Sequence, residues 1–268
     1  MNEIAIKISN LSFSYPNKNV LQDLNFEEKK GEKVALMGES GKGKSTLLRL
    51  IASYEKKQTG SIKINSKEID EKWIDDTVSY LPQDANKALF PWKKVEDNLY
   101  YPMKLRNGNL TDEDKKFCTD CVSNFNLNNV LQNYPLKLSG GEKKRLSVIM
   151  VLSIKPSIVL LDEPFAALDF KTAENLWKYL RKYFSENKTT LLLVTHSLSE
   201  AAVMADRVVF LDKGGKIVPL ENENFQKYAN QLKGEEEKML EEPGKLLLLP
   251  QFNEYKSKIR EGYEKNCI

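Results

Sequence analysis

The chain has 268 residues, of which 41% are hydrophobic and 29% charged, and these proportions are ordinary for a globular protein. This length suffices for one large domain, or a domain with subdomains, around a substantial core. The net charge of +3 comes from 41 Lys and Arg against 38 Asp and Glu, and the two signs are interspersed along the chain. We therefore expect no nucleic-acid partner.

The N-terminus and the cysteines predict a cytoplasmic chain. Residues 1–4 contain no basic segment followed by an apolar core, so no secretory signal is expected, and no apolar run approaches the roughly 20 residues that span a bilayer. The three cysteines, Cys118, Cys121 and Cys267, are too few for a disulfide framework and fit a reducing compartment. We interpret Cys118 and Cys121 as helix-packing residues, because a closed zinc site needs more Cys and His ligands than this chain offers.

The first thirty residues predict an N-terminal antiparallel sheet. Apolar and polar residues alternate over 4–8, and the alternation resumes over 11–13 after a turn or bulge at 9–10. Tyr15 lies at the end of this second segment, and residues 20–26 predict another short strand.

The stretch from Gly38 to Thr46 organises the chain, because it follows an apolar strand at 34–37 and precedes a helix-like segment at 47–51. It predicts a strand, a phosphate-binding loop and a helix. A polyphosphate needs converging donors, and backbone amides at a helix start supply them where glycines allow a close approach. Lys44 can then reach the β- and γ-phosphates, and the Ser45 hydroxyl is placed to bind Mg²⁺. The residues of this loop assigned to nucleotide binding are Gly38, Ser40, Gly41, Gly43, Lys44, Ser45 and Thr46.

A helical insertion follows the next predicted strands, at 60–65 and 78–81. The second strand ends at Pro82-Gln83-Asp84, and the sequence from about 84 to 156 is helical in character. Its likeliest helices span 97–104 and 111–125, the second with Thr111 as N-cap. Glycines in Leu138-Ser139-Gly140-Gly141 then precede an apolar helix at 145–154.

The second half of the chain predicts buried parallel strands that end in polar residues. Residues 158–161 lead into Asp162-Glu163, and residues 191–194 lead into Thr195-His196-Ser197; residues 208–211 form the expected final strand. Polar strand ends beside a phosphate loop are the layout of a nucleotide site in an open α/β sheet.

The ordered motifs resemble the ATP-binding subunit of an ATP-binding-cassette (ABC) transporter, and the match extends over about residues 3 to 215. In chain order they are the stretch 38–46, Gln83, Leu138-Ser139-Gly140-Gly141, Leu160-Leu161-Asp162-Glu163, Ala167-Leu168-Asp169 and His196. The implied fold is α/β: a P-loop ATPase core with a parallel sheet, an N-terminal antiparallel β-subdomain and a helical insertion subdomain. Two departures are Glu142, where many members have glutamine, and Ser147 to Met150, where importer subunits often show an Ala-Arg-Ala pattern.

The resemblance also implies the role of each site residue. Tyr15 would stack on adenine, Lys44 would clamp the phosphates, Ser45 and Gln83 would hold Mg²⁺, and Asp162 would reach the metal through water. Glu163 would polarise the attacking water, and His196 would contact the γ-phosphate of ATP. Ser139 and Gly141 would bind the ATP held by the opposite protomer, and Asp169 would communicate across that homodimer.

The same resemblance implies partners and a location. The chain would energise a membrane permease from the cytoplasmic side, as a peripheral subunit on the inner face of the membrane, in a system with a substrate-binding protein. Residues 89–98 resemble the corresponding segment of nitrate, sulfonate and taurine importers, and we expect a surface around Leu89, Phe90 and Trp92 to receive a permease helix. Core packing of these three residues is the alternative.

Two other functions compete with transport. One is a soluble ATPase of the same class that acts on nucleic acid or ribosomes, although such proteins often carry two cassettes or long coiled-coil insertions, which this chain lacks. The other is a regulatory nucleotide-binding module without turnover, against which Lys44, Glu163 and His196 argue. The expected domains are a 1–216 ATPase domain and a 217–268 accessory helical tail, in which Phe225, Tyr228 and Leu232 are spaced for one helix face.

Overall fold

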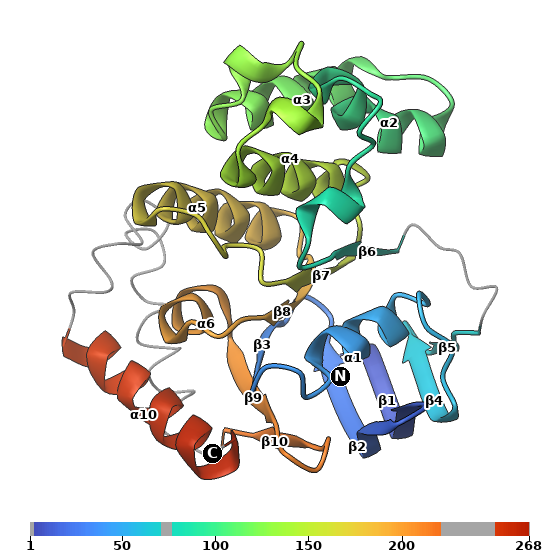
Figure 1. Ribbon diagram of the computed structural model, residues 1–268, viewed down its shortest axis with the longest axis vertical. Helices are drawn as coiled ribbons and strands as arrows, with labels where there is room; N and C mark the ends of the chain where they lie inside the picture. The colour runs from blue at the N-terminus through green and yellow to red at the C-terminus, as the bar shows by residue number, and fades with distance from the viewer. Residues whose placement is uncertain (1–2, 71–76, 221–249, 268) are drawn as a thin grey trace.

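The computed structural model describes residues 3–70, 77–220 and 250–267, and it is built around a central six-stranded sheet (Figure 1). The strand order is β10-β9-β3-β8-β7-β6, in which β10 is antiparallel to β9 and the other neighbours are parallel. The strands are β3 (Lys33–Met37), β6 (Val78–Leu81), β7 (Ile158–Asp162), β8 (Thr190–Val194), β9 (Arg207–Leu211) and β10 (Ile217–Pro219). The strand predicted at 208–211 is present as β9, but the expectation that it is the final strand is wrong, because the chain turns at 212–216 and returns along β9 as β10.

Alternation along the buried strands separates two hydrophobic cores. On β7, Val159 and Leu161 join the core shared with the helices, whereas Ile158 and Leu160 join the core shared with α1 (Lys44–Ile51) and the N-terminal sheet. All five residues of β7 are buried, as expected of a parallel strand covered on both faces. This double cover fixes the carboxyl ends of the strands, where the candidate site lies.

The N-terminal sheet is antiparallel, with the order β2-β1-β4-β5. Its strands are β1 (Ile4–Tyr15), β2 (Lys18–Lys29), β4 (Thr59–Ile64) and β5 (Lys67–Glu68). Irregular register in β1, with Asn10 at a φ of 51°, lets one continuous strand span the predicted break at 9–10. The short strand predicted at 20–26 is longer than expected, because its polar ends pair with β1 along the whole hairpin.

The insertion forms a helical subdomain beside β6 and β7, at the top of Figure 1. Its helices are α2 (Val95–Asn107), α3 (Asp112–Asn124) and α4 (Gly140–Ser153), with short 3₁₀ turns η1 (Ala85–Ala88), η2 (Asn128–Val130) and η3 (Pro135–Lys137). Thr111 caps α3 in a capping box with Asp114. The expected start of α4 at 145 is wrong: Ser139 and Glu142 form a second capping box, so Gly140 and Gly141 lie in the first turn.

The segment after Gln83 is only partly exposed, which corrects the expectation of one surface formed by three residues. Leu89 is 6% exposed and packs in the helical core, whereas Trp92 is 70% exposed. Phe90 is half-buried between them and contacts the rings of Trp92 and Tyr101 at 5.7 and 4.6 Å. The core-packing alternative therefore holds for Leu89 but not for Trp92.

The remaining helices among the described residues are α5 (Phe170–Glu186), α6 (Leu198–Met204) and α10 (Pro250–Cys267). α10 lies along α6 and β9, where Ile259 and Cys267 are buried and Tyr263 contacts the ring of Phe210 (Figure 1). The predicted helix face with Phe225, Tyr228 and Leu232 lies outside the described residues. Within 3–70, 77–220 and 250–267, no helix has the length and apolar character needed to cross a membrane.

Candidate nucleotide site

The carboxyl ends of four neighbouring parallel strands meet at one cavity of about 280 Å³. The glycine-rich loop follows β3, His196 follows β8, Asp162 and Glu163 lie at the end of β7, and Gln83 follows β6. The lining residues are Tyr15, Lys18, Val20, Ser40, Gly41, Gly43, Lys44, Ser45, Thr46, Arg49, Gln83, Glu163 and His196. Ten of the residues that the sequence assigned to the site are in this set, and the first and last of them, Tyr15 and His196, are 181 positions apart in the chain.

The loop before α1 requires glycine for steric reasons. Gly43 has a φ of 112°, and a Cβ on it would lie 2.4 Å from Val20 Cγ1. A side chain at Gly38 would also clash, because its Cβ would lie 2.7 Å from the Leu211 carbonyl oxygen. The loop can therefore pass close to its neighbours, and its amides remain available at the start of α1.

Lys44 is buried against this loop. Its ammonium donates to the carbonyls of Gly38 at 2.8 Å and Glu39 at 2.7 Å. Burial lowers the pKa of Lys44, while the nearby Glu163 and Asp162 carboxylates oppose that shift. A cation is thus held inside the loop next to the acidic strand end, where it can pair with phosphate oxygens.

Asp162 and Glu163 have different surroundings although they are adjacent. Asp162 is 1% exposed, its pKa is raised by burial, and a hydrogen bond from Ser45 acts against that shift. Its Oδ1 atom is buried without a hydrogen-bond partner. The Glu163 side chain lines the cavity. Its backbone has a φ of 47°, and its amide donates to the Val194 carbonyl at 3.0 Å. A left-handed conformation for a glutamate is uncommon, and such strain is characteristic of functional positions.

The Glu163 carboxylate is held by one contact on each oxygen. Gln83 Nε2 donates to Oε2 at 3.0 Å, and His196 Nε2 lies 3.2 Å from Oε1. Burial lowers the pKa of His196 and Lys44 adds to this effect, so the ring is neutral at pH 7 and donates a hydrogen bond from Nε2. The Ser40 hydroxyl lies 3.4 Å from the same nitrogen, which links the loop to the carboxylate.

Tyr15, at the end of β1, also lines the cavity. Its ring packs edge-on against Phe13 at 5.0 Å, and its hydroxyl donates to Glu55 at 3.1 Å and accepts from Arg49 at 2.9 Å. Lys18 donates to the Gly41 carbonyl at 2.8 Å. Lys18 and Arg49 were not predicted as site residues, because neither belongs to a motif. The position of Arg49, one helical turn after Ser45, is the signal in the sequence that could have indicated it.

The remaining predicted residues are outside the cavity lining. Gly38 and Asp162 lie directly behind it, as their contacts with Lys44 and Ser45 show. Ser139 and Gly141 are at the amino end of α4, and Asp169 caps α5 by accepting from the Thr172 amide at 3.0 Å. This chain therefore brings the loop and carboxylates together by itself, but not the Ser139 segment.

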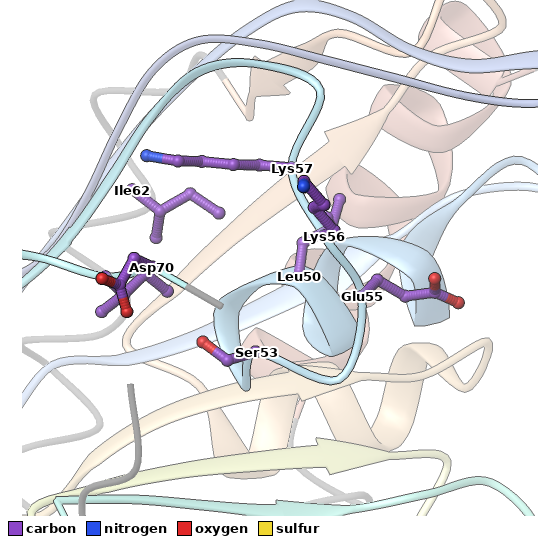
Figure 2. Close-up of a pocket in the computed structure, with 8 residues that line it drawn as sticks. Leu50, Ser53, Glu55, Lys56, Lys57, Ile62 and Asp70 are labelled. Atoms are coloured by element: carbon purple, nitrogen blue, oxygen red, sulfur yellow. The ribbon is translucent and has the colours of Figure 1, made fainter. Parts of the chain in front are cut away.

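Two other features carry no nucleotide-binding chemistry. A cavity of about 110 Å³ lies at the opposite end of α1, between Leu50 and Ser53 on one side and Ile62 and Asp70 on the other (Figure 2). Cys118 and Cys121 are buried in the helical core, and burial raises the pKa of each thiol to about 12. Among the described residues no group of three or more His, Cys, Asp or Glu side chains could hold a metal ion.

A phosphate loop at the start of a helix, with an acidic strand end facing it in a parallel sheet, defines a P-loop nucleoside triphosphatase. A family model described as ABC transporter matches residues 21–166. The aliphatic sulfonates import ATP-binding protein SsuB of Zymomonas mobilis is 41% identical over 80% of this chain and 85% of its own length. The chain belongs to the ABC transporter family, and its ATP-binding, ATP-hydrolysing class and predicted fold are confirmed.

Other similar proteins agree with this assignment. The sulfate/thiosulfate import ATP-binding protein CysA of Bacillus cereus is 34% identical over 79% of this chain, but the alignment spans only 60% of that relative. The bicarbonate transport ATP-binding protein CmpD of Synechocystis is 33% identical over 78% of this chain and 74% of its own length. A dimeric, post-hydrolysis structure of the ATP-binding cassette MJ0796 with ADP and Pi is 28% identical, with a TM-score of 0.71 over 81% of this chain and 99% of that one.

Proposed function

We propose that this chain hydrolyses ATP to drive import of a small solute through a membrane permease, in the group of sulfonate-type importers. The relatives that support this proposal are import or transport ATP-binding proteins for sulfonates, sulfate or thiosulfate, and bicarbonate, which are all small oxyanions. In this function the chain is cytoplasmic and reaches the inner face of the membrane through the permease, which works with a substrate-binding protein.

The contacts at Glu163 carry the hydrolytic part of this proposal. A carboxylate held by Gln83 and His196 at the mouth of a phosphate loop is placed to orient and polarise an attacking water. Phosphoryl transfer to water depends mainly on positioning and charge neutralisation, and Lys44 and the loop amides supply the cationic side of that site. Tyr15 offers a ring face for adenine, and the neutral His196 is a donor for the γ-phosphate.

We further propose that the site takes Mg²⁺ with the nucleotide. The Ser45 hydroxyl is hydrogen-bonded to the Asp162 carboxylate, whose Oδ1 atom is buried without a hydrogen-bond partner. Gln83 turns its amide nitrogen to Glu163, which leaves its oxygen as an acceptor. One carboxylate with neutral oxygen donors suits Mg²⁺, which keeps several waters and binds phosphate oxygens. When bound, this ion would neutralise charge on the β- and γ-phosphates.

The Ser139 segment supports action as a homodimer. Ser139 is exposed at the start of α4, where its amide and hydroxyl donate to the Glu142 carboxylate at 2.7 Å. Gly141 lies in the first turn, and because first-turn amides have no partner within a helix, this helix start can receive a phosphate from outside the chain in place of that carboxylate. Because the ATP cavity of the same chain is lined without them, we propose that they complete the ATP site of a second copy, with Asp169 beside that interface. The dimeric cassette structures are consistent with this arrangement.

Trp92 is the proposed contact with the permease. It is exposed on a turn that the buried Asn98 side chain fixes, with hydrogen bonds to the Phe90 amide at 2.8 Å and the Lys93 carbonyl at 3.0 Å. A rigidly presented tryptophan is a typical binding hot spot.

Two measurements test the proposed function. Purified chain should release phosphate from Mg-ATP, and it should sediment with membranes only when its permease is co-expressed. Turnover without permease-dependent sedimentation would instead favour a soluble ATPase.

A further inference from the structure

Lys144 is a buried lysine that the nucleotide site does not include. It lies on α4, its residue is 4% exposed, and its ammonium donates to the main-chain carbonyl of Gln83 at 2.8 Å. A lysine is almost never fully buried without a partner, because desolvating the ammonium is costly. This hydrogen bond therefore fixes both the lysine and the chain segment that carries Gln83.

A second side chain of α4 points to the same segment. The Ser147 hydroxyl, one turn after Lys144, lies 3.5 Å from the Ala85 carbonyl and donates to the Lys143 carbonyl at 2.7 Å. The contact between α4 and the residues after β6 thus includes two side chains that are one helical turn apart. It joins the helix that Ser139 caps to the loop that carries Gln83.

The positive charge of Lys144 also interacts with the carboxylates at the end of β7. Asp162 is the strongest electrostatic partner that favours its charged form, followed by Glu163 and Asp84, while burial acts against that form. In return, Lys144 and Lys44 are the two cations that act on the buried Asp162. The Lys144 ammonium on α4 thus compensates part of the negative charge of these carboxylates, in addition to Lys44 of the phosphate loop.

We propose that Lys144 is a positioning residue for ATP hydrolysis, whose ammonium holds the Gln83 main chain so that the Gln83 side chain meets Glu163. This inference rests on the proposed function, because it assigns Gln83 and Glu163 to the hydrolytic step. It follows that α4 connects the two ATP sites of the dimer. Ser139 at its amino end faces the nucleotide of the second copy, and Lys144 holds a residue of the chain's own site.

Lys144→Met tests this role, because it keeps an unbranched side chain of similar length and removes the donor. ATP binding depends on the loop and Lys44, so the dissociation constant for ATP and the thermal unfolding temperature should change little. Turnover should fall about 10- to 100-fold, the range for a displaced catalytic constellation. Lys144→Arg keeps a charged donor and should recover most of the turnover. The control, Lys116→Met, removes an exposed lysine of the same subdomain and should leave turnover unchanged.

A double-mutant cycle with Gln83→Ala shows whether Lys144 acts through Gln83. If it does, Lys144→Met should slow the Gln83→Ala protein by less than about twofold, because the residue being positioned is already gone. An equal fractional loss in both backgrounds would overturn the inference, as would a change in KM alone or a turnover loss matched by lower thermal stability. A wild-type chain without ATP turnover would refute the proposed function as well, whereas an active wild type with unchanged Lys144→Met turnover would refute only this inference.

Discussion

Glu163→Gln removes one negative charge from the candidate site and keeps the size and shape of the side chain. The volume is nearly constant, but the amide has one oxygen where the carboxylate has two, and those two now accept from Gln83 at 3.0 Å and His196 at 3.2 Å. One of the two contacts must weaken, and the remaining amide oxygen is too weakly basic to polarise water. Loss of a positioned acid-base group lowers turnover about 10²- to 10⁴-fold, or roughly 3 to 5 kcal/mol of barrier.

ATP binding should survive this change, because the loop amides and Lys44 are untouched. The Glu163→Gln protein should therefore accumulate as an ATP-bound dimer, in which uncleaved nucleotide lies between Lys44 of one copy and Ser139 of the other. Phosphate release measures turnover, a nucleotide titration measures ATP affinity, and size-exclusion chromatography with Mg-ATP measures the oligomeric state. Lys44→Ala is the matched variant, which should lose binding and stay monomeric. A Glu163→Gln protein that stays monomeric and hydrolyses ATP normally would refute the role of this carboxylate.

Three further outcomes are expected. Trp92→Ala should weaken co-purification with the permease while ATP binding and thermal unfolding stay unchanged, since this ring is 70% exposed; an equal loss of stability would indicate a packing role instead. Gly43→Ala should reduce ATP affinity at least about tenfold, because its Cβ would lie 2.4 Å from a valine methyl, whereas Gly108→Ala, with open space around it, should bind ATP normally in the same titration. Burial and the nearby Glu32 raise the pKa of Glu28 well above 4.5, so the folded protein keeps a proton that the unfolded chain releases, and stability falls as pH rises above about 4.5. Glu28→Gln should remove this decline in thermal unfolding measured from pH 5 to 9, and an unchanged pH profile would contradict the reasoning.

Local sequence patterns were sufficient to predict many helices and strands of this protein and its phosphate loop, because such elements depend mainly on neighbouring residues. The Gly38 to Thr46 loop, the apolar strand before Asp162 and the Thr111 cap were all predicted from short stretches and lie where expected. The boundary errors also have local causes: a capping box drew Gly140 and Gly141 into α4, and pairing lengthened β2. The ordered motifs further identified the family, because they recur in a fixed order along the chain.

Only the tertiary structure decided which side chains share a space. Leu89 and Trp92 are three residues apart and both have large hydrophobic side chains, yet one is buried and the other exposed, because the α2 and α4 core determines which side is covered. The hydrogen bond from Lys144 to Gln83 joins residues 61 positions apart, and nothing in either local pattern signals it. Such contacts are set by the parallel register of the sheet and the packing of helices on it, which depend on the whole chain rather than on any one segment.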